Sequence, residues 1–174
     1  LMEVEGQLAW YQLEELGLPP EPWILFLGGM ALFAGSKAMF ELAERLQLGG
    51  PDRELFLALP VGVDEIKAAA DSGLSRSQQA QVMEQHPAEA LLLAMSDLPL
   101  PSRRSLANAA VAAARVQLPV SGQNLLDGGV SPGPHIGRAL RLTRDALIDD
   151  MIAADEALGW ALQTARSLEV EMSV

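Results

Sequence analysis

Six arginines between residues 101 and 144 are the side chains whose type and spacing best fit a chemical task. Only one acidic residue, Asp127, accompanies them in that segment. The planar guanidinium of arginine matches phosphate oxygens better than a lysine ammonium does, so such a cluster is typical of a phosphate-binding surface. The alternative is a set of solvated helix faces that pair with the acidic majority of the chain. The six are Arg103, Arg104, Arg115, Arg138, Arg141 and Arg144.

The rest of the chain is strongly acidic. The formal net charge is −11 over 174 residues. Residues 1–100 hold five basic and fifteen acidic side chains, and residues 145–174 hold one and seven. A negative charge of this size favours solubility and disfavours contact with a polyanion. A site for an anion is therefore expected only in the basic segment.

Other groups that could do chemistry have simpler structural interpretations. Asp52 and Glu54 are similar to the paired carboxylates of two-metal sites, but they fall in the expected first turn of a helix, where acidic residues complement the helix dipole. Residues 29–37 lack the glycine spacing and the Lys-Ser order of a phosphate loop. The two histidines, His86 and His135, have no partners at metal-binding spacing. We therefore predict no catalytic residue, no metal site and no cofactor in this chain.

The turns that would position the last three arginines lie between Leu118 and Asp150. The prolines and glycine of residues 131–134 predict a rigid turn, and Pro134 suits the first position of a helix, where no N–H is needed. A helix from Pro134 to about Asp150 would hold its arginines on one face and offer free N–H groups to an anion at its N-terminus. Its apolar stripe is expected at Ile136, Leu140, Thr143 and Leu147.

This stretch resembles the C-terminal signature of the bacterial tRNA nucleotidyltransferases, which add CCA or A to tRNA, and of their poly(A) polymerase-like relatives. Asn124 departs from the pattern, because the family usually has Asp there. Weaker matches near the N-terminus are Trp10-Tyr11, Leu13 and Glu21-Pro22-Trp23. The matching residues of the signature are Val120, Gly122, Leu125, Leu126, Gly129, Val130, Pro132, Gly133, Pro134, Ile136, Gly137 and Leu140.

The resemblance implies that this chain is the helical body and tail of a longer enzyme, a transferase of tRNA processing. The catalytic head of that family carries a mixed sheet and two metal-binding aspartates, and this sequence shows neither pattern. The implied role is to hold tRNA while the absent head adds CCA or A, which would require Mg²⁺ and CTP or ATP. The implied partners are tRNA, bound weakly, and the head and neck of the same polypeptide, in the cytoplasm.

The resemblance also divides the signature residues into two groups. The expected RNA- and phosphate-binding residues are the six arginines with Gly133 and His135. The expected structural positions are Gly122, Gly129, Pro132, Pro134 and Gly137. Gly133 and Gly137 would allow close approach of a backbone, although Gly137 could instead pack against the Ala-rich helix.

A different class of function stays open. The chain could be an acidic helical module that docks onto a neighbouring domain or forms a homo-oligomer, without RNA contact. Binding to RNA would be sensitive to salt, whereas self-association through apolar surfaces would tolerate it.

The apolar periodicity is helical throughout, so we expect an all-α fold of about nine to eleven helices without a sheet. Gly28 and Gly29 inside one helix indicate close contact with a neighbour, because each costs about 1 kcal/mol relative to alanine. An Ala-rich helix over residues 103–117 is expected to lie centrally. Helices are also expected over residues 8–16 and at starts marked by Glu21-Pro22, Ser36, Pro51-Asp52, Asp64, Ser75 and Pro87.

The division of the chain is expected near Pro99 and Pro101. Residues 1–100 form an acidic segment and residues 101–174 a tail with the signature, together making one continuous helical unit excised from a longer enzyme. The longest apolar run, residues 23–35, is shorter than the roughly 20 residues of a membrane span. The chain has no cysteine and its N-terminus is acidic, which fits a cytosolic protein without a signal peptide.

Overall fold

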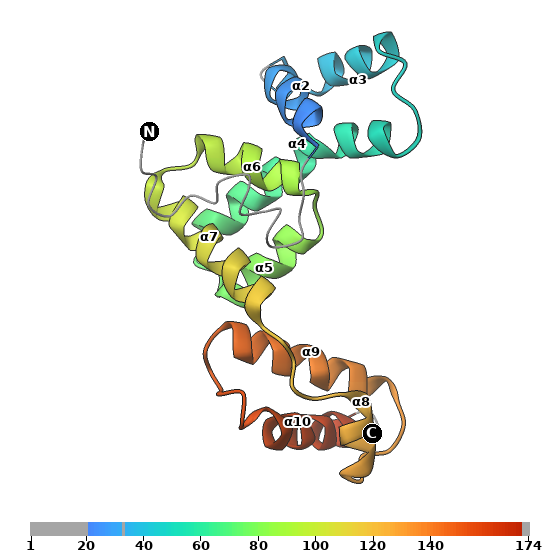
Figure 1. The fold of residues 1–174 in the computed structure, drawn as a ribbon, viewed down its shortest axis with the longest axis vertical. Helices are drawn as coiled ribbons and strands as arrows, with labels where there is room; N and C mark the ends of the chain where they lie inside the picture. Colours follow the sequence, from blue (N-terminus) through green and yellow to red (C-terminus); the bar gives the residue numbers. More distant parts are fainter. Residues whose placement is uncertain (1–20, 33, 172–174) are drawn as a thin grey trace. The chain divides into compact units, whose positions relative to one another are not determined.

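The computed structural model describes residues 21–32 and 34–171, and helices account for 76% of them. No strand occurs in these ranges, so the expected all-α fold is confirmed. The expected helix over residues 8–16, with Trp10-Tyr11 and Leu13, lies outside the described residues. The described helices are α2 (Pro22–Leu32), α3 (Ser36–Arg45), α4 (Gly50–Asp71), α5 (Arg76–Glu84), α6 (Ala88–Asp97), α7 (Leu100–Arg115), α8 (Gly122–Asp127), α9 (Pro134–Ile148) and α10 (Ala157–Glu171) (Figure 1).

The chain divides into two compact units. The first is Leu1–Val111 and the second is Ala112–Val174. The sequence predicts a change of segment at residues 100 and 101, which are the first two residues of α7.

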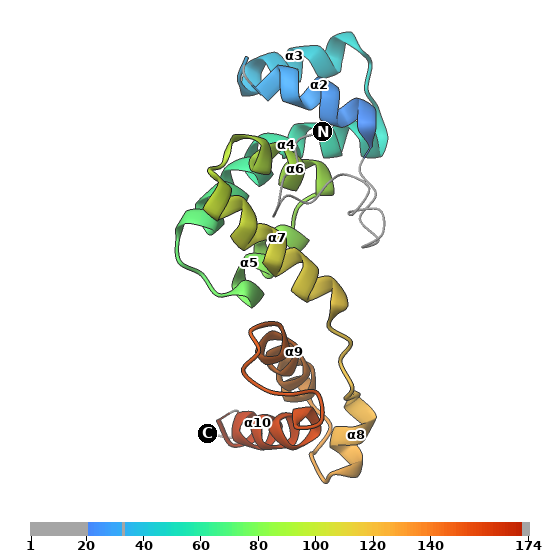
Figure 2. The ribbon, with the colours of Figure 1, turned by 60° about the vertical axis from the view of Figure 1, so that its left-hand side comes forward.

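Helix α4 is the centre of the first unit, where it packs against α2, α3, α5 and α6 (Figure 2). The prediction that Asp64 opens a new helix is wrong, because α4 runs through both Pro60 and Asp64. An internal proline costs about 3 kcal/mol. Burial on both sides of Pro60 offsets this cost, since one apolar face continues along the whole helix. That face contains Phe56, Leu59, Val63 and Ile66.

Two glycines bring helices of the first unit close together. A Cβ atom on Gly28 of α2 would lie 2.5 Å from Leu59 Cδ1, so the close contact expected from the sequence is confirmed at this residue. A Cβ atom on Gly62 of α4 would lie 2.9 Å from the Cβ atom of Ala90 in α6. The backbones of α4 and α6 therefore approach at a distance that only glycine permits.

Polar contacts connect the remaining elements of the first unit. The buried carboxylate of Glu89 in α6 accepts a hydrogen bond from the backbone N–H of Glu21, just before α2. Ser75 begins α5 with a capping box that includes Gln78, as its position in the sequence predicts. Helix α7 begins before the expected Arg103 and buries one face, which contains Leu106, Ala107, Ala109 and Ala110. The prediction that this Ala-rich helix lies centrally is wrong, because α4 has the central place and α7 packs only weakly on the other described helices.

The second unit consists of α8, α9 and α10 around a separate core. Helices α9 and α10 lie side by side (Figures 1 and 2). Alanines at the contact allow the two helices to pack closely. The fully buried residues of this core include Leu125, Ala139, Ala157, Ala161 and Ala165.

We predict that Gly62→Ala lowers the free energy of unfolding by about 1–3 kcal/mol, as expected for overpacking. The new methyl group would meet Ala90 Cβ, which cannot move without its backbone. Gly29→Ala is the control, because its Cβ would lie 3.4 Å from Leu93 Cδ2. That variant should gain up to about 1 kcal/mol from helix propensity. Urea denaturation followed by circular dichroism measures both, and an equal gain for both would contradict the close packing of α4 on α6.

Candidate functional site

Helix α8 is the first element of the signature stretch, and reciprocal hydrogen bonds begin it. Ser121 Oγ accepts from the backbone N–H of Asn124 at 3.3 Å, and Asn124 Oδ1 accepts from the backbone N–H of Ser121 at 2.9 Å. Each bond satisfies an N–H that the helix leaves free. The amide oxygen of Asn124 therefore supplies the acceptor that an aspartate would supply at this position.

The end of α8 explains the glycines and Val130 of the signature. The N–H of Val130 donates to Leu125 O at 3.1 Å, and the N–H of Gly129 donates to Leu126 O at 2.9 Å. This is the Schellman pattern, which requires a left-handed residue after the helix. Gly129 has φ +84°, a conformation that glycine adopts without strain. Val130 and Leu125 are both buried in the core of the second unit.

Pro134 is at the start of α9, as the sequence predicts, and the helix continues to Ile148. Gly133 precedes it with extended backbone, so its φ angle does not explain the glycine. A Cβ atom on Gly133 would lie 2.6 Å from Cε1 and 2.7 Å from Nδ1 of His135. The imidazole therefore folds back against Gly133 and occupies the space of a side chain there.

His135 is 6% exposed, and its Nε2 atom is buried and has no hydrogen-bond partner among the residues that the structure describes. The ring therefore packs against the backbone of the turn at Gly133. This burial gives His135 a packing role, and direct contact of the residue with phosphate stays a prediction.

The buried face of α9 differs from the expected stripe. Thr143 is buried as predicted and donates to Ala139 O at 2.8 Å. The other predicted positions, Ile136, Leu140 and Leu147, are only partly buried against the core. The centre of the face is instead Ala139, because its methyl group permits close contact with the alanines of α10. Alanine is too small to stand out in an apolar stripe that is defined by large side chains, so the periodicity did not indicate this residue.

Arg138 and Arg141 are exposed on α9. Within the described ranges, neither makes a hydrogen bond or an ion pair. Arg144 is half-buried, and unlike the other two it interacts with another residue of the protein. The expected row of three arginines is therefore a pair of free side chains, one turn apart, followed by an engaged one.

The other three arginines have different surroundings. Arg103 is half-buried and its Nε donates to Leu98 O. Its charge also contributes to a lowered pKa of Asp97, for which the hydrogen bond from Lys67 is the main cause. Arg104 is exposed but interacts with another residue of the protein. Arg115 is exposed at the end of α7. Arg103 and Arg104 belong to the first unit, whereas Arg115 belongs to the second together with the arginines of α9.

The remaining glycine of the motif, Gly137, is exposed in the first turn of α9. A Cβ atom there would meet nothing within 4 Å. Packing within the second unit therefore does not explain why this residue is glycine. Gly122, by contrast, lies where a Cβ would touch Ile136 at 3.4 Å, so it lets α8 lie against α9.

The rejected candidates lie in structural settings. Asp52 and Glu54 are exposed near the start of α4, and Asp52 lies in its first turn. His86 Nε2 is paired with Glu65 Oε2 at 2.8 Å. Within the part of the chain that the structure describes, no three His, Asp or Glu side chains are grouped closely enough to hold a metal ion.

No family model matches this sequence, and neither the curated proteins nor the solved structures give a match. The functional interpretation therefore depends on the residues and geometry described above. Among the described helices, none combines the length and the apolar character that crossing a bilayer would need.

We predict that Gly133→Ala destabilises the second unit by about 1–3 kcal/mol, because its methyl group would overlap the buried His135 ring. Gly137→Ala is the matched control, and it should instead gain up to about 1 kcal/mol of helix stability. Thermal unfolding followed by circular dichroism compares the two. In a His135→Ala background the effect of Gly133→Ala should shrink, and an undiminished penalty would show that the ring is not the cause.

Proposed function

We propose that this chain is the RNA-binding C-terminal region of a longer tRNA nucleotidyltransferase. In this role it holds tRNA while a catalytic head adds CCA or A to the 3′ end. The signature supports the proposal, because its residues have consistent structural roles. Ser121 and Asn124 begin α8, Gly129 ends it, and Pro134 begins α9.

The observation that carries the proposal is the pair Arg138 and Arg141 on the exposed face of α9. Both side chains are free within the described residues, and both follow the N-terminus of a 15-residue helix. The partial positive charge of that N-terminus adds to theirs. Gly137 has no neighbour where its side chain would be, so a phosphate backbone could come close to the helix there. RNA is held in this way through phosphate contacts and shape.

The acidic remainder of the chain limits the affinity of this surface. We expect weak, non-specific dissociation constants of about 10⁻⁴ to 10⁻⁶ M. Strong and specific binding would then need the head and neck of the same polypeptide. Mg²⁺ and CTP or ATP belong to that head, and the cytoplasm is where tRNA would be met.

We predict that the double variant Arg138→Gln, Arg141→Gln binds tRNA more weakly and with a smaller salt dependence. The slope of log K against log salt concentration should fall by about 0.7 to 0.9 for each phosphate that the variant no longer neutralises. The control is Lys37→Gln, Arg76→Gln, which removes two positive charges from the first unit and none from α9. Fluorescence anisotropy of labelled tRNA across a salt series measures both. Equal slopes for the two double variants would reject α9 as the site.

Gly137→Ala gives a second and independent test of the same surface. Its methyl group should stabilise the helix, as argued above, and also hold a phosphate backbone away from it. We predict a higher melting temperature together with weaker tRNA binding. Unchanged binding would show that RNA does not approach α9 at its first turn.

We also predict that this chain alone incorporates no CMP or AMP into tRNA in the presence of Mg²⁺ and excess nucleotide. The candidate carboxylates Asp52 and Glu54 lie at a helix start and not on a strand. Incorporation of radiolabelled nucleotide measures the activity. Activity that survives purification and disappears in Asp52→Ala would show that these carboxylates are catalytic.

A further inference from the structure

Helix α2 is apolar on all sides but is only partly buried. Its sequence, PWILFLGGMAL, contains no charged residue. A helix of this kind is normally enclosed by protein. Phe26 is nevertheless 75% exposed, Met30 58% and Trp23 39%. Their spacing places these three residues on one side of α2. Together with Ala38 and Leu42 of the neighbouring α3 they are called the α2–α3 face below, an apolar surface with the aromatic and Met side chains that protein interfaces favour.

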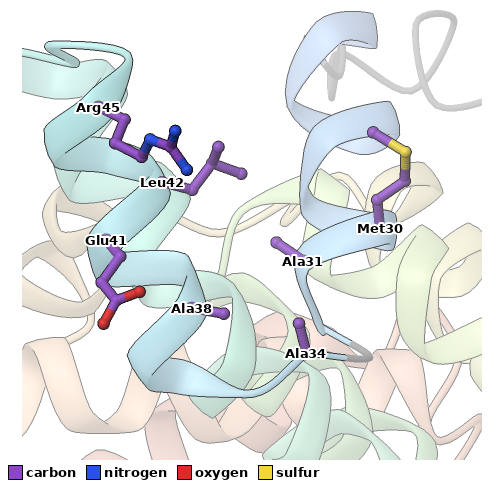
Figure 3. Close-up of a pocket in the computed structure, with 7 residues that line it drawn as sticks. All are labelled: Met30, Ala31, Ala34, Ala38, Glu41, Leu42 and Arg45. Carbon is purple, nitrogen blue, oxygen red and sulfur yellow. The ribbon is translucent and has the colours of Figure 1, made fainter.

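A groove of about 310 Å³ lies between the two helices (Figure 3). Met30 and Ala34 line one side of it and Ala38 and Leu42 the other. The small alanines make the groove, because they leave space that larger side chains would fill. It can therefore receive a bulky apolar side chain from a partner.

The charges at this surface balance, in contrast to those of the whole chain. Helix α3 has two basic and two acidic residues and α2 has none, whereas the chain carries −11. Glu41 and Arg45 lie one helical turn apart on the groove. Glu41 is loosely paired with Lys37 at 3.7 Å, and Arg45 makes no ion pair with any residue that the structure describes.

We propose that the α2–α3 face binds a second copy of this chain in a twofold-symmetric dimer. A twofold interface uses the same patch on both copies, so that patch must be self-complementary. Here Phe26 or Met30 of one copy can enter the groove of the other, while Arg45 of each copy meets Glu41 of its partner. Two strongly acidic chains can also meet here without bringing like net charge together, because the face itself is neutral. This inference is independent of RNA binding.

The first test is the association of the purified chain, measured by analytical ultracentrifugation from about 1 to 100 μM, a range suited to a modest interface. The wild-type chain should form a concentration-dependent dimer. Phe26→Ser should weaken it by about tenfold or more, as loss of a central aromatic anchor does. Met151→Ser is the matched control, because Met151 is 72% exposed but lies in the second unit. Its dimer should be unchanged.

The second test addresses the symmetry of the interface through its charges. The variants Glu41→Arg and Arg45→Glu should each dimerise more weakly, because each places like charges opposite one another. An equimolar mixture of the two should associate better than either alone, because their grooves then carry opposite charge. The same mixture with Phe26→Ser in both chains should lose this gain, which excludes a general attraction between differently charged chains.

The two association tests have outcomes that either support or overturn the dimer. A dimer that Phe26→Ser weakens, that Met151→Ser leaves intact and that the charge mixture restores supports the proposal. A chain that stays monomeric at every concentration overturns it and leaves the face to another occupant, such as a neighbouring domain. A dimer that Phe26→Ser does not affect, or a mixture that associates no better than its components, also overturns it.

Discussion

In both units, neighbouring helices pack closely at positions where one of them has a glycine. Gly28 makes room for Leu59, Gly62 for Ala90 and Gly128 for Leu162. Close packing brings more atoms into van der Waals contact, and this offsets the cost of glycine inside a helix. The turn before α9 also depends on a glycine, since Gly133 leaves the space that the His135 ring fills. The positions of the helices, and therefore of the exposed arginines, depend on these small residues.

Much of the fold follows from local signals in the sequence. Pro22, Ser75, Pro87 and Pro134 lie at or next to the first residues of their helices, because caps and proline act on the backbone independently of the rest of the fold. The prediction that a new helix begins at Asp64 was wrong because one buried face continues along α4 on both sides of Pro60 and Asp64. Whether a proline ends a helix depends on tertiary burial, which no local signal records.

The candidate site was predictable in outline but not in its details. The spacing of Arg138 and Arg141 indicated a shared exposed face, and the structure has it. The burial of His135 was not predictable, because it depends on the missing side chain of Gly133. The engaged state of Arg144 and the central place of Ala139 also depend on neighbours distant in sequence. The α2–α3 face could not be found from apolar periodicity either, since a uniformly apolar helix gives no sign of which side stays uncovered.

The proline inside α4 has a mechanical consequence for the first unit. Pro60 lacks the N–H that would bond to the carbonyl of Phe56, so the helix is easiest to bend at this point. It lies between Leu59, which meets α2, and Gly62, which meets α6. Helix α2 also packs on α6, where Leu93 lies beside Gly28 and Gly29, and Glu89 of α6 accepts a hydrogen bond from the backbone N–H of Glu21. These contacts connect the two sides of Pro60, so a bend of α4 at this point would also have to break them.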